Sequence, residues 1–365
     1  MKRLLLMTPD FPPRTGGVAR YLAALALYFK NDLRVITTPE KDCEVFDAEA
    51  PYPIERRDLF FKNFWPRWFK TVWLLIKEGK SFELLIVSHV LPFGTAAWLS
   101  KFVTKKSYMV IVHGMDVSLA CRSKQKRWLT EKVLRGAKVV ITNTKALAAE
   151  VERDFGVKRT VVCYPGIKNL GHLAPDQEES GRSKRDFVLL TVSRLVSRKG
   201  HLRVLKAISE LQEQIPNLRY RIIGEGPELA EIIRVANELG IYDLLRLNGR
   251  VTDTEIAEAY DEADIFVMPT VVDEVDREGF GIVYLEAAVH GLPSIATDHP
   301  GVDEAVINNQ TGLLVPDGDI EALKEAILRL RSNPKERRSL GSAARSRATE
   351  DFVWEKSFEK LKSFL

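Results

Sequence analysis

The sequence has few cysteines and no long run of apolar residues. Cys43, Cys121 and Cys163 are its only cysteines, and none belongs to a Cys-x-x-Cys pair. This spacing indicates neither a disulfide framework nor a cysteine zinc site, and it favours a reducing cytoplasm. No apolar run approaches the ~18–20 residues of a membrane helix. The apolar stretch in the opening MKRLLLMTPDF is too short for a signal peptide, and this segment is predicted to be a first strand. We expect a protein that is not integral to a membrane.

A dinucleotide-binding motif is also missing. No Gly-x-Gly-x-x-Gly sequence follows the first predicted strand, and no acidic residue stands at the dinucleotide spacing, which argues against a nicotinamide-dependent dehydrogenase. The net charge is only +4, yet residues 1–168 carry a net +13 and residues 169–365 a net −9. The basic first part favours an anionic partner. It contains no recognised nucleic-acid motif, so we expect no nucleic acid among the partners.

The length and pattern of the chain predict two α/β domains. A chain of 365 residues usually forms more than one hydrophobic core. Short β-rich apolar runs alternate with amphipathic helical stretches, which indicates parallel sheets wrapped by helices in two Rossmann-like domains. The predicted strands are 4–9, 33–38, 84–89, 108–114, 139–144 and 160–165, then 187–195, 220–226, 244–250, 264–270, 293–298 and 312–316.

The predicted domain boundaries follow from composition. The first domain covers residues 1–168, and the polar residues 169–186 are the predicted linker. The second domain covers residues 187–348. Residues 349–365 form a terminal helix that either packs back across the first domain or caps the second.

Ligands of open α/β sheets bind at the carboxyl ends of the strands. In the first domain Gly16 and Gly17 follow strand 4–9, where they either expose backbone N–H groups to an anion at the start of helix 18–29 or form an ordinary tight turn. His113 and Asp116 close strand 108–114, and His113 is either a site residue or a packed one.

In the second domain, charged residues follow two predicted strands. Arg194 and Lys199 lie in the loop after strand 187–195 and suit a diphosphate, although basic loop residues are often only solvated surface. Glu278 and Glu286 bracket a run of glycines and apolar residues. If a helix starts near Gly279 or Phe280, the two carboxylates contact the tip and the middle of an elongated ligand; the alternative is an N-cap and an incidental glutamate.

An aromatic and basic segment covers residues 60–77 of the first domain. Its aromatic side chains are interspersed with Lys62, Arg67, Lys70 and Lys77, as in helices that lie on anionic membranes. The alternative is a helix packed on the sheet with its aromatic residues in the core.

Six motifs occur in order across nearly the whole chain: TPDFPPRTGGV, HGMD, SRLVSRKG, GEGP, EGFGIVYLEA and TGLLVPDGD. Together they resemble the retaining family-four glycosyltransferases, and FPPRTGG, SRLVSRKG and DREGFGIVYLEA are most similar to the phosphatidylinositol-mannoside mannosyltransferase branch. The resemblance implies a GT-B fold, in which two Rossmann-like domains face each other across a cleft.

The resemblance also implies roles for individual residues. Arg194 and Lys199 would hold the donor diphosphate, Glu286 the ribose hydroxyls and Glu278 the donor sugar. The remaining implied contacts are the backbone of Gly279, Phe280, Gly281 and Ile282 with sugar and phosphate, Arg250 and Val251 with the base, Gly17 with the diphosphate on domain closure, and His113 near the anomeric carbon. One departure is the segment 271–277, which replaces a shorter proline-containing approach to Glu278.

The implied reaction moves a hexose onto a lipid or lipid-linked glycan. Mannose from GDP-mannose is the first expectation for this hexose. No cofactor and no metal are expected, because two cations and a helix N-terminus supply positive charge; Asp319 of the only Asp-x-Asp, Asp317-Gly-Asp319, is predicted to be an N-cap instead. We expect a cytoplasmic enzyme, peripheral on the inner face of the cell membrane, where its basic first domain meets anionic lipid. The alternatives are a UDP- or dTDP-sugar donor for surface polysaccharide synthesis, a non-catalytic partner subunit, and a sugar-nucleotide epimerase.

Overall fold

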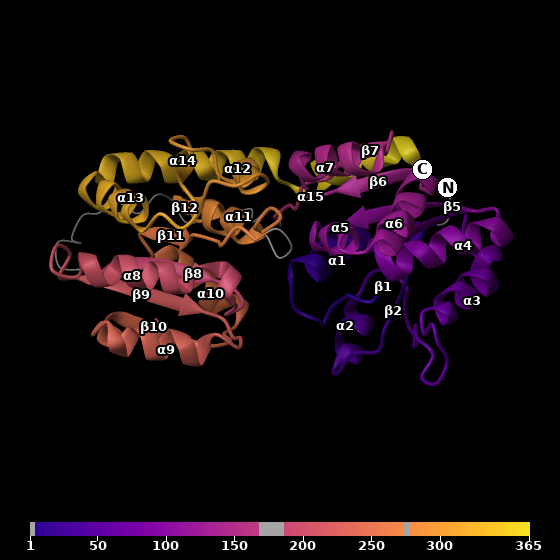
Figure 1. The fold of residues 1–365 in the computed structure, drawn as a ribbon, viewed down its shortest axis with the longest axis horizontal. Helices are drawn as coiled ribbons and strands as arrows, with labels where there is room; N and C mark the ends of the chain where they lie inside the picture. Colours follow the sequence, from indigo (N-terminus) through magenta and orange to yellow (C-terminus); the bar gives the residue numbers. More distant parts are fainter. Residues whose placement is uncertain (1–3, 168–185, 274–277) are drawn as a thin grey trace. The chain divides into compact units, whose positions relative to one another are not determined.

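The computed structural model describes residues 4–167, 186–273 and 278–365. The chain forms two compact units, the first made of Met1–Gly166 with Trp354–Leu365 and the second of Ile167–Val353 (Figure 1). The predicted linker, residues 169–186, lies outside the described residues except for Asp186.

The first unit is a seven-stranded parallel sheet of order β3-β2-β1-β4-β5-β6-β7. Its strands are β1 Leu4–Thr8, β2 Leu33–Thr37, β3 Ile54–Arg56, β4 Leu84–Ser88, β5 Ser107–Val112, β6 Val139–Thr142 and β7 Thr160–Val162. Its helices are α1 Gly17–Tyr28, α2 Cys43–Glu49, α3 Phe69–Lys77, α4 Thr95–Thr104, α5 Met115–Cys121, α6 Lys124–Gly136, α7 Lys145–Phe155 and α15 Trp354–Glu359.

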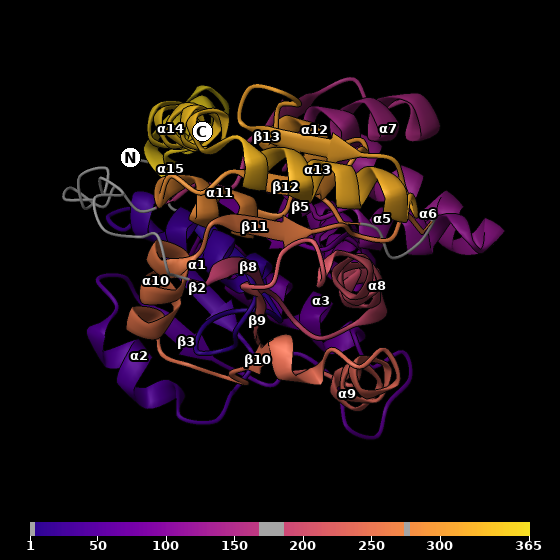
Figure 2. The ribbon, with the colours of Figure 1, turned by 90° about the vertical axis from the view of Figure 1, so that its left-hand side faces the viewer.

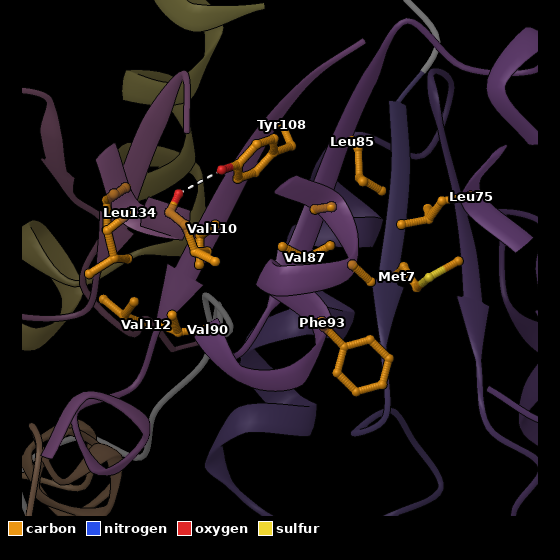
Figure 3. Packing of buried hydrophobic residues seen from close by; sticks show 14 of the residues in the cluster. Met7, Leu75, Leu85, Val87, Val90, Phe93, Tyr108, Val110, Val112 and Leu134 are labelled. Carbon is orange, nitrogen blue, oxygen red and sulfur yellow. Dashed lines mark hydrogen bonds between the residues drawn. The ribbon is translucent and has the colours of Figure 1, made fainter. Parts of the chain in front are cut away.

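The central strands are apolar throughout because both faces of the sheet are covered. Successive side chains alternate between two clusters: Leu5 and Met7 pack with α3, α4 and α6, whereas Leu4 and Leu6 pack with α1 and the C-terminal segment. Figure 3 shows the first cluster, in which the hydroxyl of Tyr108 donates to the carbonyl of Val133 at 2.6 Å.

The second unit is a six-stranded parallel sheet of order β10-β9-β8-β11-β12-β13. Its strands are β8 Phe187–Val192, β9 Leu218–Ile223, β10 Leu245–Leu247, β11 Ile265–Met268, β12 Ser294–Thr297 and β13 Gly312–Val315. Its helices are α8 His201–Leu211, α9 Leu229–Glu238, α10 Asp253–Glu262, α11 Ile282–Val289, α12 Val302–Ala305, α13 Ile320–Ser332 and α14 Pro334–Asp351. Helices α8, α9 and α13 cover one face, and α10 and α11 the other (Figure 2).

The prediction of two parallel-sheet Rossmann-like domains is confirmed, and each predicted strand overlaps an observed one. Strand β3 was missed because its sequence, Ile-Glu-Arg, has no apolar run. The terminal helix follows the first of the two alternatives, since Phe358 lies in the core of the first unit, with its ring 5.4 Å from that of Tyr21.

Candidate functional site

The loop after β8 carries three cations. Arg194 is exposed, and its side chain has no hydrogen-bond or ion-pair partner among the residues that the structure describes. Arg198 and Lys199 lie in a short 3-10 helix, Ser197–Lys199. Gly200 ends this turn at φ +76°, and a Cβ placed there would overlap the carbonyl oxygen of Pro269. The loop is therefore held against the end of β11 by a position that only glycine fits.

Glu278 is the anion that Arg198 and Lys199 share. Arg198 Nη1 lies 2.5 Å from Glu278 Oε2, and Lys199 Nζ contacts the same oxygen. All three side chains are largely buried, at 21%, 11% and 12% exposure for Arg198, Lys199 and Glu278. Burial acts to raise the pKa of Glu278, but Lys199 and then Arg198 outweigh it and hold the pKa below its ordinary value. Glu278 is thus a carboxylate at neutral pH.

Sequence reasoning missed Arg198. It selected Arg194 and Lys199 by their spacing and treated Arg198 only as a third basic loop residue. No local pattern singled it out, because its partner Glu278 lies eighty residues further along the chain and only the fold brings the two side chains together. The structure shows that Arg198 also anchors the segment leading to Glu278, since its carbonyl accepts from the N–H of Val271 at 2.8 Å.

Glycine turns bring the ends of β8, β9 and β10 together. A Cβ at Gly224 would overlap the carbonyl oxygen of Ser193, and one at Gly226 that of Leu195. The N–H of Gly224 donates to the carbonyl of Gly249 at 2.8 Å. Arg250 and Val251 follow Gly249 directly, so this contact places both beside the Gly224 turn. The motif GEGP therefore shapes the site by close backbone approach.

A buried histidine joins two of these loops. His201, the first residue of α8, is fully buried; its Nε2 lies 3.1 Å from Ser193 Oγ and its Nδ1 lies 3.2 Å from Glu228 Oε2. Burial, and next the charge of Lys199, lower the pKa of His201 to about 4. Sequence reasoning did not select it, because only the fold places it between the loops after β8 and β9.

Acid should weaken the second unit through His201. Its pKa is lower in the folded chain than the ordinary 6.5, so the unfolded chain binds more protons between pH 6.5 and 4, and stability is lost as pH falls through that window. We expect the free energy of unfolding to lose about 2 kcal/mol from this residue between pH 7.5 and 5. Urea unfolding of wild type and His201→Gln at both pH values measures it. A difference between the two proteins that does not change with pH contradicts the assignment.

Helix α11 starts later than expected. The sequence analysis placed its start near Gly279 or Phe280, but it begins at Ile282, with Gly281 as the N-cap at φ +77°. A Cβ on Gly281 would lie 2.5 Å from the ring of Tyr284, so glycine is required there. Glu278 is consequently separated from the helix by three residues and is held by Arg198 and Lys199 rather than by the helix end.

Glu286 lies in the second turn of α11. Its Oε2 accepts a hydrogen bond from the hydroxyl of Tyr260 at 3.2 Å, and the side chain is half-buried.

The predicted N-cap role of Asp319 is confirmed, because its carboxylate accepts from the N–H of Ala322 at 2.9 Å at the start of α13. Asp317 instead pairs with Arg203 at 2.6 Å. Residues 274–277 of the unusual segment 271–277 lie outside the described residues.

The first unit holds Gly16, Gly17 and His113 at the carboxyl ends of its strands. Gly16 is the N-cap of α1 at φ +141°, and Gly17 is the first residue of that helix. His113 follows β5, and its N–H donates to Asp116 Oδ1 at 3.0 Å. Burial, and next the nearby His89, lower the pKa of His113 to about 3, so its imidazole is neutral at physiological pH.

The segment 60–77 is divided between core and surface. Phe60 and Trp68 pack against the first core, and Val72, Leu74 and Leu75 of α3 are buried in it. A second set is exposed: Phe64, Trp65, Phe69, Trp73 and Ile76, with Trp65 at 87%. Neither alternative of the sequence analysis is therefore complete.

Two features are absent from the described residues. No helix in this part of the chain is long and apolar enough to cross a membrane. Within the same ranges, no group of three or more histidine, cysteine, aspartate or glutamate residues is placed to hold a metal ion.

Comparison with known proteins matches a glycosyltransferase family model to each half of the chain. Residues 15–168 match the family model Glycosyltransferase Family 4, and residues 174–347 match Glycosyl transferases group 1. The GDP-mannose-dependent alpha-(1-6)-phosphatidylinositol monomannoside mannosyltransferase of Mycolicibacterium smegmatis is 27% identical, over 99% of this chain and 98% of its own. The amylovoran biosynthesis glycosyltransferase AmsK of Erwinia amylovora is 31% identical, over 72% of this chain and 64% of its own.

The fold matches solved glycosyltransferase structures. HepE of Anabaena, solved in complex with UDP, is 18% identical and superimposes with a TM-score of 0.82, over 99% of this chain and 98% of its own. This likeness confirms the GT-B fold. With two glycosyltransferase models matched in tandem and relatives that span its full length, the chain belongs to the family-four glycosyltransferases of the GT-B fold.

Proposed function

We propose that this glycosyltransferase moves mannose from GDP-mannose to a lipid or lipid-linked glycan acceptor, with retention of configuration. The observation that carries the proposal is the exposed Arg194 in the same loop as Arg198 and Lys199, which both bind the carboxylate of Glu278. Cations that follow β8 and a carboxylate that follows the neighbouring strand β11 suit a diphosphate joined to a sugar. The choice of mannose and of a lipid acceptor is based on the name of the relative from Mycolicibacterium smegmatis, which matches this chain over nearly its full length.

Lys199 is suited to contact sugar and phosphate at once. An ammonium group carries three N–H donors, so Lys199 can keep Glu278 and still donate to a phosphate oxygen. Because the pKa of Glu278 is lowered, its carboxylate is available to accept hydrogen bonds from sugar hydroxyls. Arg194 remains for the oxygen of the leaving diphosphate, where negative charge develops.

The chemistry that we propose needs no metal and no carboxylate nucleophile. The acceptor hydroxyl oxygen forms a bond to the anomeric carbon on the face from which the diphosphate departs. The bond from that carbon to the phosphate oxygen breaks, and the freed oxygen takes the hydroxyl proton. The positive charge that a metal would supply comes from Arg194, Lys199 and the backbone N–H groups at the start of α11.

Product analysis tests this function. The protein is incubated with GDP-mannose and phosphatidylinositol mannoside, and the anomeric configuration of the new linkage is read by NMR. An α-mannoside supports the proposal. Products formed only from a UDP- or dTDP-sugar, or a β-mannoside, contradict it.

A different donor and acceptor is the second candidate. The relative AmsK acts in amylovoran biosynthesis, and HepE was solved with UDP, so surface polysaccharide synthesis from a UDP-sugar fits the same fold. A non-catalytic partner subunit is the third candidate. It is disfavoured because Arg194, Lys199, Glu278 and Glu286 are all present.

The acceptor side of the proposal is a peripheral contact with an anionic membrane at the inner face of the cell membrane. Support comes from the net +13 of residues 1–168 and from the exposed aromatic set on and before α3, where Lys77 Nζ lies 5.4 Å from the ring of Trp73. Aromatic rings and lysines together suit the interface of an anionic bilayer.

Trp65 and Trp68 form a matched pair that tests the membrane contact. Trp65→Ala removes an exposed ring, so we expect vesicle binding to weaken at least about tenfold with an unchanged Tm. Trp68→Ala removes a ring that packs on the core, so we expect a lower Tm instead. Co-sedimentation with phosphatidylglycerol vesicles and thermal unfolding measure the two effects. Equal vesicle binding by wild type and Trp65→Ala would remove the membrane role of this residue.

A further inference from the structure

A serine hydroxyl lies between two imidazole rings in the first unit. Ser88 ends β4 and is fully buried. Its Oγ lies 3.0 Å from Nδ1 of His89 and 3.0 Å from Nε2 of His113. The two rings have centroids 5.2 Å apart. A hydroxyl has one proton, so it can donate to only one of these nitrogens and must accept from the other.

The outer end of this chain of contacts is a carboxylate. His89 Nε2 lies 3.4 Å from Asp10 Oδ2, and Asp10 Oδ1 accepts from Arg14 at 2.5 Å. An ionised carboxylate has no proton to donate, so a neutral His89 places its N–H on Nε2, facing Asp10. Nδ1 of His89 then carries no proton and accepts a hydrogen bond from the hydroxyl group of Ser88.

The direction of the remaining contact follows. Because the proton of Ser88 points to His89, the lone pairs of its oxygen face His113, and His113 donates its Nε2–H to them. The second ring nitrogen of His113, Nδ1, then carries no proton. This assignment requires a neutral His113, which agrees with its low pKa of about 3.

The surrounding backbone indicates that the arrangement is built rather than incidental. His89 adopts φ +73° and ψ 133°, a conformation that costs a non-glycine residue free energy. Asp116 joins the loops that carry both histidines, since its Oδ2 accepts from the N–H of Val90 at 3.2 Å and its Oδ1 from the N–H of His113 at 3.0 Å. These bonds hold the two rings at the ends of β4 and β5.

We propose that Asp10, His89 and Ser88 are positioning residues that hold His113 as the Nε2–H tautomer, so that its Nδ1 accepts a hydrogen bond from a hydroxyl group of the bound substrate. Only the identity of that hydroxyl, on a donor or acceptor sugar, rests on the proposed function. The tautomer itself depends on the contacts within the first unit. The groups that face His89 are Asp10, with Arg14 behind it, and His113.

Nitrogen-15 NMR of the full chain, labelled at histidine, tests the tautomer at pH 7.5. The signals of His113 are assigned by their loss in His113→Gln. We expect a protonated Nε2 and an unprotonated Nδ1 in the wild type. A protonated Nδ1 overturns the proposal, whether or not the protein transfers a sugar. The assignment can therefore stand even where the proposed donor fails.

Ser88→Ala tests the positioning role. Without the hydroxyl, His113 loses the acceptor of its Nε2–H, so we expect its signals to move toward a mixture of tautomers. With the donor that the enzyme turns over, we expect kcat to fall on the order of tenfold. The matched control is Ser100→Ala, which removes a buried hydroxyl of α4 that donates to the carbonyl of Ala97 and should change neither readout. His113 signals that stay unchanged in Ser88→Ala overturn the proposal.

Discussion

Replacing Arg194 by alanine is expected to lower turnover on the order of 10²–10³-fold while leaving the fold intact. The guanidinium is exposed and has no partner among the described residues, so its loss breaks no internal contact. Arg194 is proposed to stabilise only the transition state, in which the leaving diphosphate gains negative charge. The expected signature is a reduced kcat with a donor KM that changes much less.

Arg246 provides the matched control for this substitution. It is an exposed arginine in β10, so Arg246→Ala removes the same charge from the same unit and should retain wild-type turnover. Steady-state rates and Tm are measured for both variants. Equal turnover of Arg194→Ala and wild type would remove Arg194 from the reaction.

Replacing Lys199 by alanine is expected to reduce both activity and stability. The substitution leaves the buried carboxylate of Glu278 with Arg198 as its main partner, and breaking a buried pair on one side costs about 3 kcal/mol or more. Because Lys199 is also proposed to contact the diphosphate, turnover should fall by about 10²-fold or more. Urea unfolding and steady-state kinetics measure the two losses.

A double variant separates these losses. In Lys199→Ala/Glu278→Ala the uncompensated carboxylate is gone, so stability should recover in part, whereas turnover should remain low. Activity that recovers together with stability would show that Lys199 acts only by holding Glu278. Glu278→Gln alone keeps the shape of the side chain, and its turnover reports whether the charge is needed.

Much of the fold could be predicted because both sheets are buried on both faces. Strands such as Leu4–Thr8 and Ile265–Met268 consist almost wholly of apolar residues, and turns with glycine or charge mark their carboxyl ends. The short charged strand Ile54–Arg56 carries neither signal, so it was missed. The start of α11 was misplaced by two to three residues because a pattern of glycines does not show which one takes the left-handed conformation of the N-cap; the structure assigns it to Gly281.

Contacts between distant residues were beyond a reading of the sequence. Arg198 and Glu278 are eighty residues apart, and His201 meets Glu228 only because β8 and β9 are neighbours. Ser88 meets His113 in the same way, through the pairing of β4 with β5. Motifs showed which loops matter, whereas the register of the strands decides which side chains in those loops touch. The roles taken from resemblance, among them those of Glu286, Arg250 and Val251, stay predictions.

The measurement that tests the central claim most directly is a panel of GDP-, UDP- and dTDP-sugars, each assayed for thermal stabilisation and slow hydrolysis with and without EDTA. We expect GDP-mannose to raise Tm, because a donor at a hundredfold excess over its Kd stabilises the folded chain by about 2.7 kcal/mol. Its hydrolysis should be the same with EDTA. A response to UDP- or dTDP-sugars alone would contradict the mannose donor, and no response to any sugar nucleotide would contradict the catalytic role.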